Sequence, residues 1–301
     1  MAGANSIRTI FFALGANFSI AIAKLVAAII TGSGAMMAES IHSFADTGNQ
    51  LLLLFGMRQS KRPATDEHPL GYGKSIYWWS FLVALMLFSM GGMYSLYEGW
   101  HKLQHPESLS APWVAIGVLI FGIIAESVSM WGCLREVNKV RHGRSYLRWF
   151  KQSRQSELLV IFGEDLAALL GLVFALIAIF ATMVTGNPIY DAIGTLLIGA
   201  LLIFIAIAIA VEVKALIIGQ GVEPDERQRM LDFLEQQPAI AEVYNLRTLQ
   251  LGNEVMAAIK ARLQPTGSEE AMIKAINQCE MAFSQAFPHV TWLFFEPDNE
   301  D

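Results

Sequence analysis

The stretch AIGTLLIGALLIFIAIAIAV, residues 192–211, decides the fold class of this chain. It contains no charged residue and is long enough to cross a lipid bilayer, which takes about 17–25 predominantly apolar residues in a helix. The stretch LLGLVFALIAIFATMV, residues 169–184, has the same character and comes shortly before it. These two runs predict an α-helical membrane protein.

The composition of the whole chain agrees with this prediction. Of its 301 residues, 54% are hydrophobic and 16% are charged, whereas soluble domains carry roughly 25% charged residues. Further apolar stretches bring the number of expected transmembrane helices to six. These spans lie near residues 8–31, 35–57, 76–100, 112–134, 157–185 and 189–218.

Positive charge is concentrated in two of the expected connections between spans. Residues 58–74 contain four lysines and arginines and residues 135–154 contain seven, whereas the connections on the other side carry Lys102 alone. Because cytoplasmic loops hold the excess of Lys and Arg, both basic loops are expected in the cytoplasm, and so are both termini. We expect an integral protein of the inner, or cytoplasmic, membrane. The net charge of −6 reflects acid concentrated after residue 222, so nucleic acid is not an expected partner.

A change in character near residue 222 predicts a small cytoplasmic domain after the last span. Gly252-Asn253 is a tight-turn pair between two strand-like segments, and Thr266 and Glu269 have the spacing of a helix capping box. The order is α-β-β-α-β, a ferredoxin-like α+β arrangement whose small core favours dimerisation. The expected elements are a helix from Pro224, strands over 243–251 and 254–263, a helix from Ser268 and a strand over 290–295.

His42 and Asp46 are ionisable residues inside the second expected span. An aspartate at the centre of a membrane helix costs about 2.5–3.5 kcal/mol on insertion scales, so such residues usually face the bundle interior and mark an ion pathway. On a helix, Glu39, His42, Asp46 and Asn49 project within a sector of roughly 80° and can line one cavity. Imidazole nitrogen and carboxylate oxygen suit zinc and its divalent neighbours. The alternative is a histidine with a purely structural hydrogen bond.

Glu164 and Asp165 form a second acidic pair, inside the fifth expected span. Their side chains point about 100° apart on a helix, so both can flank a common cavity. A cation would offset their repulsion, and without one they would hold a proton, which gives the site a natural exchange of metal for protons. The alternative is a pair of acids in the first helical turn, near Glu157.

Weaker candidates lie elsewhere. In the first basic loop, Asp66, Glu67 and His68 form a compact cluster that can hold a second cation, and a solvated turn is the alternative. Cys133 and Cys279 lack metal-ligand or disulfide spacing, so both are expected to be reduced and buried. The remaining polar residues of the spans are expected at helix contacts or at the membrane interface: Asn17, Lys24, Glu126 and Asp191.

Two motifs resemble signatures of the cation diffusion facilitator (CDF) family, which exports zinc and related divalent ions. Residues 32–50, GSGAMMAESIHSFADTGNQ, resemble its second-span signature with a His/Asp-x-x-x-Asp pair, and residues 68–74, HPLGYGK, are similar to its His-x-x-Gly-x-Gly-Lys segment. The resemblance covers the whole chain. It implies a six-helix transmembrane domain over residues 1–218 and a cytoplasmic dimerisation domain over residues 219–301. It also implies a homodimeric transporter rather than an enzyme, without a prosthetic group.

The fifth span departs from the family pattern. The usual motif there is His-x-x-x-Asp, and aligning its aspartate with Asp165 places Ile161 where the histidine should be. Glu164 is the nearest replacement, which is similar to the branch that contains the zinc transporter 9 type proteins. The implied metal ligands are therefore His42, Asp46, Asp165 and Glu164. Zinc is the expected cargo, but a single nitrogen donor moves the preference toward harder ions, so manganese, iron, cobalt and cadmium stay open.

The leading hypothesis is an antiporter in the lipid bilayer that exchanges a divalent cation for protons by alternating access. An intramembrane hydrolase with a metal-bound water would need three protein ligands and an open coordination position. The sequence offers no general base beside a substrate cleft for it. A membrane metal sensor or scaffold that does not transport is the third hypothesis.

Overall fold

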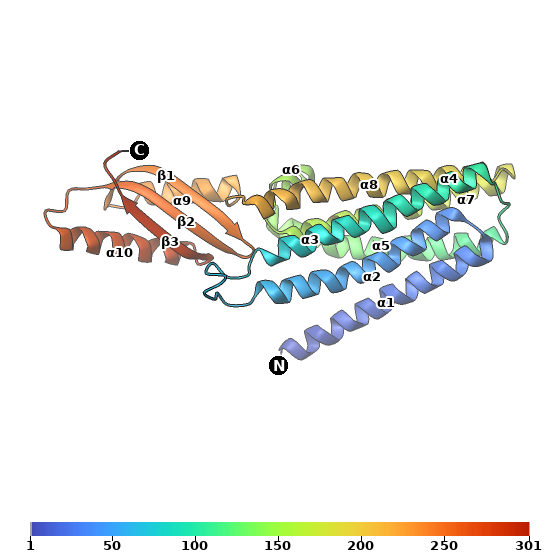
Figure 1. The fold of residues 1–301 in the computed structure, drawn as a ribbon, viewed down its shortest axis with the longest axis horizontal. Coiled ribbons are helices and arrows are strands. Elements are labelled where there is room, and N and C mark those ends of the chain that lie inside the picture. The colour runs from blue at the N-terminus through green and yellow to red at the C-terminus, as the bar shows by residue number, and fades with distance from the viewer. Residues whose placement is uncertain (1, 301) are drawn as a thin grey trace. The chain divides into compact units, whose positions relative to one another are not determined.

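The structure is a computed structural model that describes residues 2–300, with side chains from Gly15 onward apart from Ala16. Six long helical segments follow one another up to residue 218 (Figure 1), and each expected span falls on one of them. They are α1 (Ala2–Thr31), α2 (Gly34–Ser60), the continuous α3 (Ser75–Met86), η1 (Leu87–Met93) and α4 (Tyr94–Gln104), α5 (Pro112–Val140), α7 (Ser156–Thr185) and α8 (Ile189–Ile218).

Four of these segments are long and apolar enough to cross a membrane: Ser75–Gln104, Pro112–Val140, Ser156–Thr185 and Ile189–Ile218. The side chains described for α1 give a shorter apolar run, Asn17–Thr31. In α2 the apolar run is interrupted by polar residues, among them His42 and Asp46. The second span therefore carries polar groups that need partners other than lipid.

The third helical segment packs closely on α8 through glycines. A Cβ added to Gly99 would lie 2.9 Å from the backbone nitrogen of Leu196, and one added to Gly199 would lie 2.8 Å from that of Leu96. Small residues at such positions let two membrane helices approach each other closely. Between α3 and α4 the backbone widens into the π-helical turn η1, which was not predicted.

Residue contacts divide the chain into two compact units. The first comprises Met1–Phe55, Trp79–Ser145 and Glu157–Glu212, and the second comprises Gly56–Trp78, Tyr146–Ser156 and Val213–Asp301. The second unit therefore joins the C-terminal tail to the first basic loop and to α6 (Tyr146–Gln152), a short helix that the sequence analysis did not predict. Within this unit, the backbone nitrogen of Gly252 donates to the hydroxyl of Tyr77 over 2.9 Å.

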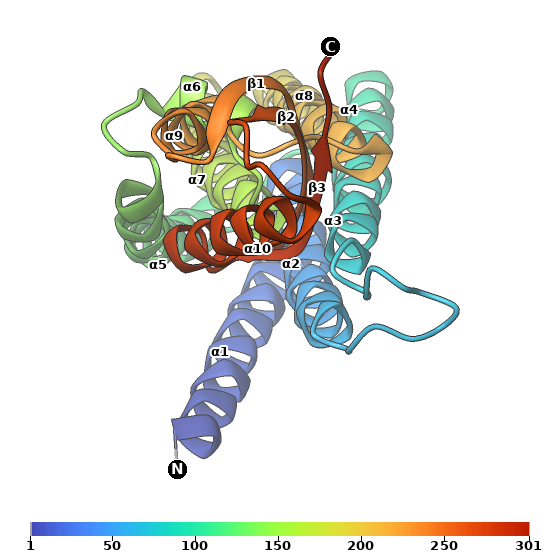
Figure 2. The same ribbon diagram turned by 90° about the vertical axis from the view of Figure 1, so that its left-hand side faces the viewer.

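The tail folds in the predicted α-β-β-α-β order. The central strand β2 pairs antiparallel with β1 and parallel with β3. Residues of α9 and α10 share one core with β2, including Met230, Phe283 and Ile259, so both helices cover the same face of the sheet (Figure 2). The elements are α9 (Pro224–Glu235), β1 (Ile240–Leu251), β2 (Glu254–Leu263), α10 (Glu269–Ala286) and β3 (Val290–Pro297).

Two details of the tail differ from expectation or refine it. The predicted capping box of Thr266 and Glu269 is wrong, because the N-cap is Ser268, whose hydroxyl accepts from the Ala271 nitrogen over 3.2 Å. The first helical turn therefore begins two residues later than that spacing implied. Cys279 is free and buried as expected, and its burial raises the pKa of the thiol to about 11.

Candidate functional site

The polar face predicted for α2 lies inside the helical unit. Glu39, His42 and Asn49 are fully buried, and the side chain of Asp46 is 16% exposed. Their spacing of three and four residues places them on one side of the helix. The four residues therefore lie on one largely buried side of α2, and that they line one cavity stays a prediction.

His42 and Asp46 approach each other without satisfying each other. Nδ1 of His42 lies 3.4 Å from Oδ1 of Asp46. Both ring nitrogens of His42 and Oδ1 of Asp46 are buried without a hydrogen-bond partner. Such an unsatisfied polar atom costs about 1–3 kcal/mol. The pair therefore has free donor atoms of the two kinds that bind zinc.

Glu164 and Asp165 each have a hydrogen-bond donor on a different helix. Nδ2 of Asn49 in α2 donates to Oε1 of Glu164 over 2.5 Å, and Oγ of Ser129 in α5 donates to Oδ1 of Asp165 over 3.1 Å. The second oxygen of Asp165, Oδ2, is buried and has no hydrogen-bond partner. The fifth-span pair therefore lies where α7 meets α2 and α5.

The four candidate ligands lie near one another but are not gathered around one point. Asp46 is close enough to Glu164 for electrostatic interaction between α2 and α7. Among the side chains that the structure describes, however, no three His, Cys, Asp or Glu groups are close enough to hold a metal ion. Binding by all four would require Glu164 to leave Asn49, or the two helices to approach.

Three further residues belong to this neighbourhood: Asn49, which was expected on the polar face of α2, and Ser129 and Glu126, which were given no place in the site. Asn49 holds Glu164, Ser129 holds Asp165, and Glu126 of α5 interacts electrostatically with both Asp46 and Asp165. The available signal was the spacing of Glu126 and Ser129, which puts both on one face of α5. What the sequence does not give is which face of α5 turns toward α7.

The other candidates lie apart from this group. Asp66, Glu67 and His68 are exposed in the first basic loop, where the His68 ring stacks on Tyr72 with ring centroids 4.3 Å apart. That loop forms the solvated turn given as the alternative. Ile161, which stands where the family's histidine is expected, is 38% exposed.

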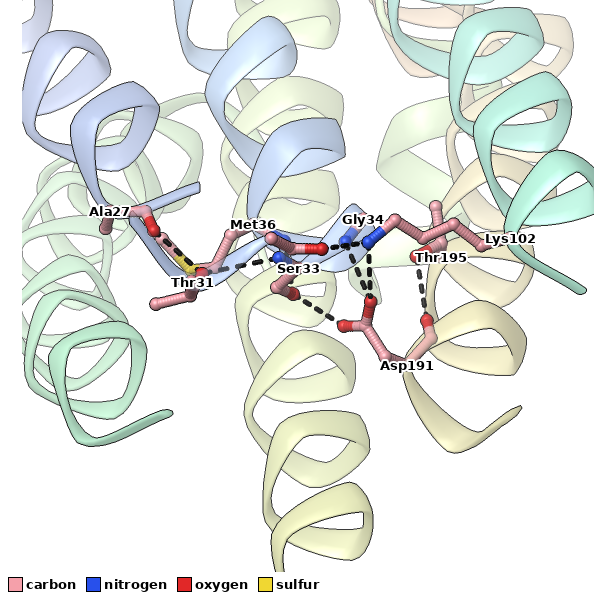
Figure 3. A network of polar contacts seen from close by, with 9 residues as sticks. Ala27, Thr31, Ser33, Gly34, Met36, Lys102, Asp191 and Thr195 are labelled. Carbon is pink, nitrogen blue, oxygen red and sulfur yellow. Dashed lines mark hydrogen bonds and ion pairs between the residues drawn. The ribbon is translucent and has the colours of Figure 1, made fainter. Parts of the chain in front are cut away.

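A second buried acidic group lies at the connection between α1 and α2 (Figure 3). Oδ1 of Asp191 in α8 accepts from the Ser33 hydroxyl over 2.5 Å, and Oδ2 accepts from the Gly34 nitrogen over 2.7 Å. The ammonium of Lys102 in α4 lies 3.5 Å from Oδ2 and also donates to the Gly32 carbonyl. Asp191 therefore makes a helix contact, one of the two roles expected for it, and ties α8, α4 and the start of α2 together.

Comparisons with known proteins agree with this arrangement. The chain is 34% identical over 231 residues to the proton-coupled zinc antiporter SLC30A9, mitochondrial, of Xenopus laevis, covering 76% of this chain and 41% of that protein. It is 28% identical over 252 residues to metal tolerance protein C4 of Arabidopsis thaliana, covering 82% of this chain and 55% of that protein. It is also 27% identical over 236 residues to the cation-efflux pump FieF of Serratia proteamaculans (strain 568), covering 76% and 71%.

The chain thus spans about two fifths of the length of the animal antiporters that it matches. A family model described as the cation efflux transmembrane domain matches residues 10–218, a range that includes α1 from Ile10 onward and the other five long helical segments in full. This makes the protein an integral membrane protein. The match covers more than half of the chain, and so the chain belongs to the cation efflux, or cation diffusion facilitator, family.

Proposed function

We propose that this protein exports a divalent cation, with zinc as the best fit, in exchange for protons. The observation that carries the proposal is the pair of His42 and Asp46. Both ring nitrogens of His42 and Oδ1 of Asp46 are buried without a hydrogen-bond partner, and Asp46 lies within electrostatic reach of Glu164 on α7. His42, Asp46, Asp165 and Glu164 would bind the ion together. Burial of three carboxylates with one imidazole gives a negatively charged site that favours either a cation or protons.

Exchange follows from the hydrogen bonds that hold the fifth-span pair. Glu164 accepts a hydrogen bond from Asn49, and Asp165 accepts one from Ser129. A divalent ion would draw both carboxylates toward His42 and Asp46, and protons would return them. The relative from Xenopus laevis is named as a proton-coupled zinc antiporter, which supports the same coupling here.

The choice of ion rests on the donor atoms. One nitrogen and three carboxylate donors bind zinc, yet they also accept manganese, iron, cobalt and cadmium more readily than a site with two histidines would. The bacterial relative is named only as a cation-efflux pump. We propose zinc as the main cargo, and a transporter rather than an enzyme.

The wider arrangement is part of the proposal. Residues 1–218 would form the membrane domain, and residues 219–301 a cytoplasmic domain through which two copies form a homodimer in the lipid bilayer. Phe295 of β3 packs on the core of the tail, whereas Phe294 is 54% exposed on the other face of the strand. That face is available to a second copy. Both termini would then lie in the cytoplasm, with the protein in the inner, or cytoplasmic, membrane.

Transport can be tested with the purified protein in proteoliposomes loaded with a zinc-sensitive dye. A pH gradient should drive zinc flux, and Asp46→Ala and Asp165→Ala should each abolish it. Glu98→Gln, a half-buried carboxylate on α4 away from the site, is the control and should retain flux. Unchanged flux in both alanine variants would refute the proposed function.

A further inference from the structure

A lysine lies inside the membrane helices, on α1. Lys24 is fully buried, and its stem lies against α5, where a Cβ at Gly122 would be 3.6 Å from its Cε atom. Its ammonium lies 3.2 Å from Oε2 of Glu39 and donates to Oγ of Ser43 over 2.7 Å, both on α2. A charge in this environment is tolerated only when it is paired. The ammonium of Lys24 is therefore paired with polar groups of α2, the helix that also carries His42 and Asp46.

Glu39, the partner of Lys24, uses only one of its two oxygens. Oε1 is buried without a hydrogen-bond partner. It lies against Gly171 of α7, where any side chain would overlap it. Oε1 of Glu39, at the contact between α2 and α7, is therefore an acceptor without a hydrogen-bond donor. Oδ1 of Asp46 and Oδ2 of Asp165 are two more.

The position of Glu39 along the bundle differs from that of the proposed ion site. Glu39 precedes Asp46 by seven residues, which is about 10 Å along α2 toward the α1–α2 connection. On α7, Gly171 follows Asp165 by six residues, about 9 Å toward the α7–α8 connection. Both connections lie at one end of the unit, because Asp191 at the start of α8 bonds to Ser33 and Gly34. The position of Glu39 on α2 and the position of its contact Gly171 on α7 both place Glu39 between the ion site and that end of the unit.

We propose that Glu39 is a second binding position for the transported cation, and that Lys24 occupies it as a tethered cation until the divalent ion displaces it. The inference rests on the proposed function. A divalent ion attracts a carboxylate about twice as strongly as an ammonium at the same distance. The displaced ammonium keeps its bond to Ser43 and has Glu126 of α5 within electrostatic reach. An ion leaving toward the α1–α2 connection would therefore pass from Asp46 to Glu39.

The alternative is an ion pair that only stabilises the fold, and a pair of charge-neutralising variants separates the two. Zinc flux into proteoliposomes and zinc affinity in detergent, by calorimetry, are measured for Glu39→Gln, Lys24→Gln and the double variant. We expect Glu39→Gln to slow flux about tenfold, the effect of one lost contact of about 1.4 kcal/mol. Its affinity for zinc at the first site should stay within about twofold. Lys24→Gln should bind a second zinc ion per chain.

The double variant decides the question, because it leaves no uncompensated buried charge and therefore folds even if Lys24→Gln does not. Flux as slow as in Glu39→Gln supports the proposal, since the second position is missing. Flux restored to the wild-type rate overturns it, because the pair would then be only structural. A loss of affinity for the first zinc ion in parallel with flux also overturns it, since Glu39 would belong to the first site.

Asp46→Asn, measured in the same assay, distinguishes a failure of the role of Glu39 from a failure of the proposed function. If Asp46→Asn is inactive and the double variant is fast, only the role of Glu39 is lost. If Asp46→Asn transports zinc as the wild type does, the proposed function itself fails. Glu98→Gln serves again as the control for loss of a carboxylate.

Discussion

Two buried aspartates of the helical unit have opposite surroundings. Asp191 is satisfied on both oxygens, by Ser33, Gly34 and the ammonium of Lys102. Asp46 has one oxygen, Oδ1, that is buried without a hydrogen-bond partner and faces a histidine whose ring nitrogens also lack partners. Both are acids in membrane helices, so burial alone does not separate them.

The hydrogen-bond partners of a buried acid indicate its role. When a buried carboxylate has donors on both oxygens, these hydrogen bonds offset the free energy of hydration that it lost on burial. Such a carboxylate stabilises the contact between helices. A carboxylate left unsatisfied destabilises the resting fold and gains most from a ligand. Asp191 is on this argument a structural residue, and Asp46 a binding residue.

Asp46→Asn should have the largest effect, and it should fall on binding. Losing one ligand of a metal site is expected to weaken zinc affinity by about 100-fold or more, beyond the 10–100-fold typical of residues that only orient ligands. Its free energy of unfolding should not fall, because the replacement removes an unsatisfied charge. Calorimetric titration and unfolding of the same preparation measure both. Lower stability with unchanged zinc affinity would mean that Asp46 is a structural residue and not a binding residue.

Asp191→Asn should show the converse. We expect its free energy of unfolding to fall by about 1.5–3 kcal/mol, the contribution of one hydrogen bond to a charged group. Zinc affinity should stay within about twofold, as for a distant independent site. Thermal or denaturant unfolding in detergent gives the first quantity and calorimetry the second. A large loss of affinity at unchanged stability would mean that Asp191 also takes part in binding.

Glu164→His should change which ion the site prefers. Adding a second nitrogen donor favours zinc over manganese, and we expect the ratio of their affinities to rise by about tenfold, or 1.4 kcal/mol. Competition between the two ions for the purified protein measures the ratio, with Glu164→Gln as the control for loss of charge. An unchanged ratio would indicate that Glu164 stays on Asn49 and does not contact the ion.

Ser129→Ala should have the smallest effect. It removes one hydrogen bond from Asp165, worth about 0.5–1.5 kcal/mol, so zinc affinity should change by about two- to tenfold. Ser127→Ala is a matched control, because the Ser127 hydroxyl donates to the Ile123 carbonyl of its own helix over 2.6 Å and not to a carboxylate. Equal effects of the two variants would remove Ser129 from the site.

The sequence predicted most of the fold because its signals are local. Long apolar runs locate all six helical segments, and the alternation in residues 254–263 with the Gly252-Asn253 turn locates the hairpin of the tail. The turn η1 and the helix α6 were missed. The first lies where Gly91 and Gly92 pack against α8, and the second has only seven residues, of which Trp149 is the buried one.

The candidate site was predicted only in part, because the sequence gives local signals and not the contacts between helices. That four polar residues share one side of α2 follows from helical periodicity alone, and three of them are buried in the structure. Which atom meets which depends on how neighbouring helices are rotated, a property that no single helix encodes. The partners of Glu164 and Asp165 and the pairing of Lys24 with Glu39 therefore became visible only in three dimensions.

We propose above that a divalent ion binds between α2 and α7. Anomalous scattering at the zinc edge, from crystals of the zinc-loaded protein, locates that ion directly. We predict one peak per chain in the helical unit, about 2.0–2.2 Å from a ring nitrogen of His42 and from carboxylate oxygens of Asp46 and Asp165. Zinc bound only at the loop of residues 66–68 or in the C-terminal tail, with none beside His42, would contradict it.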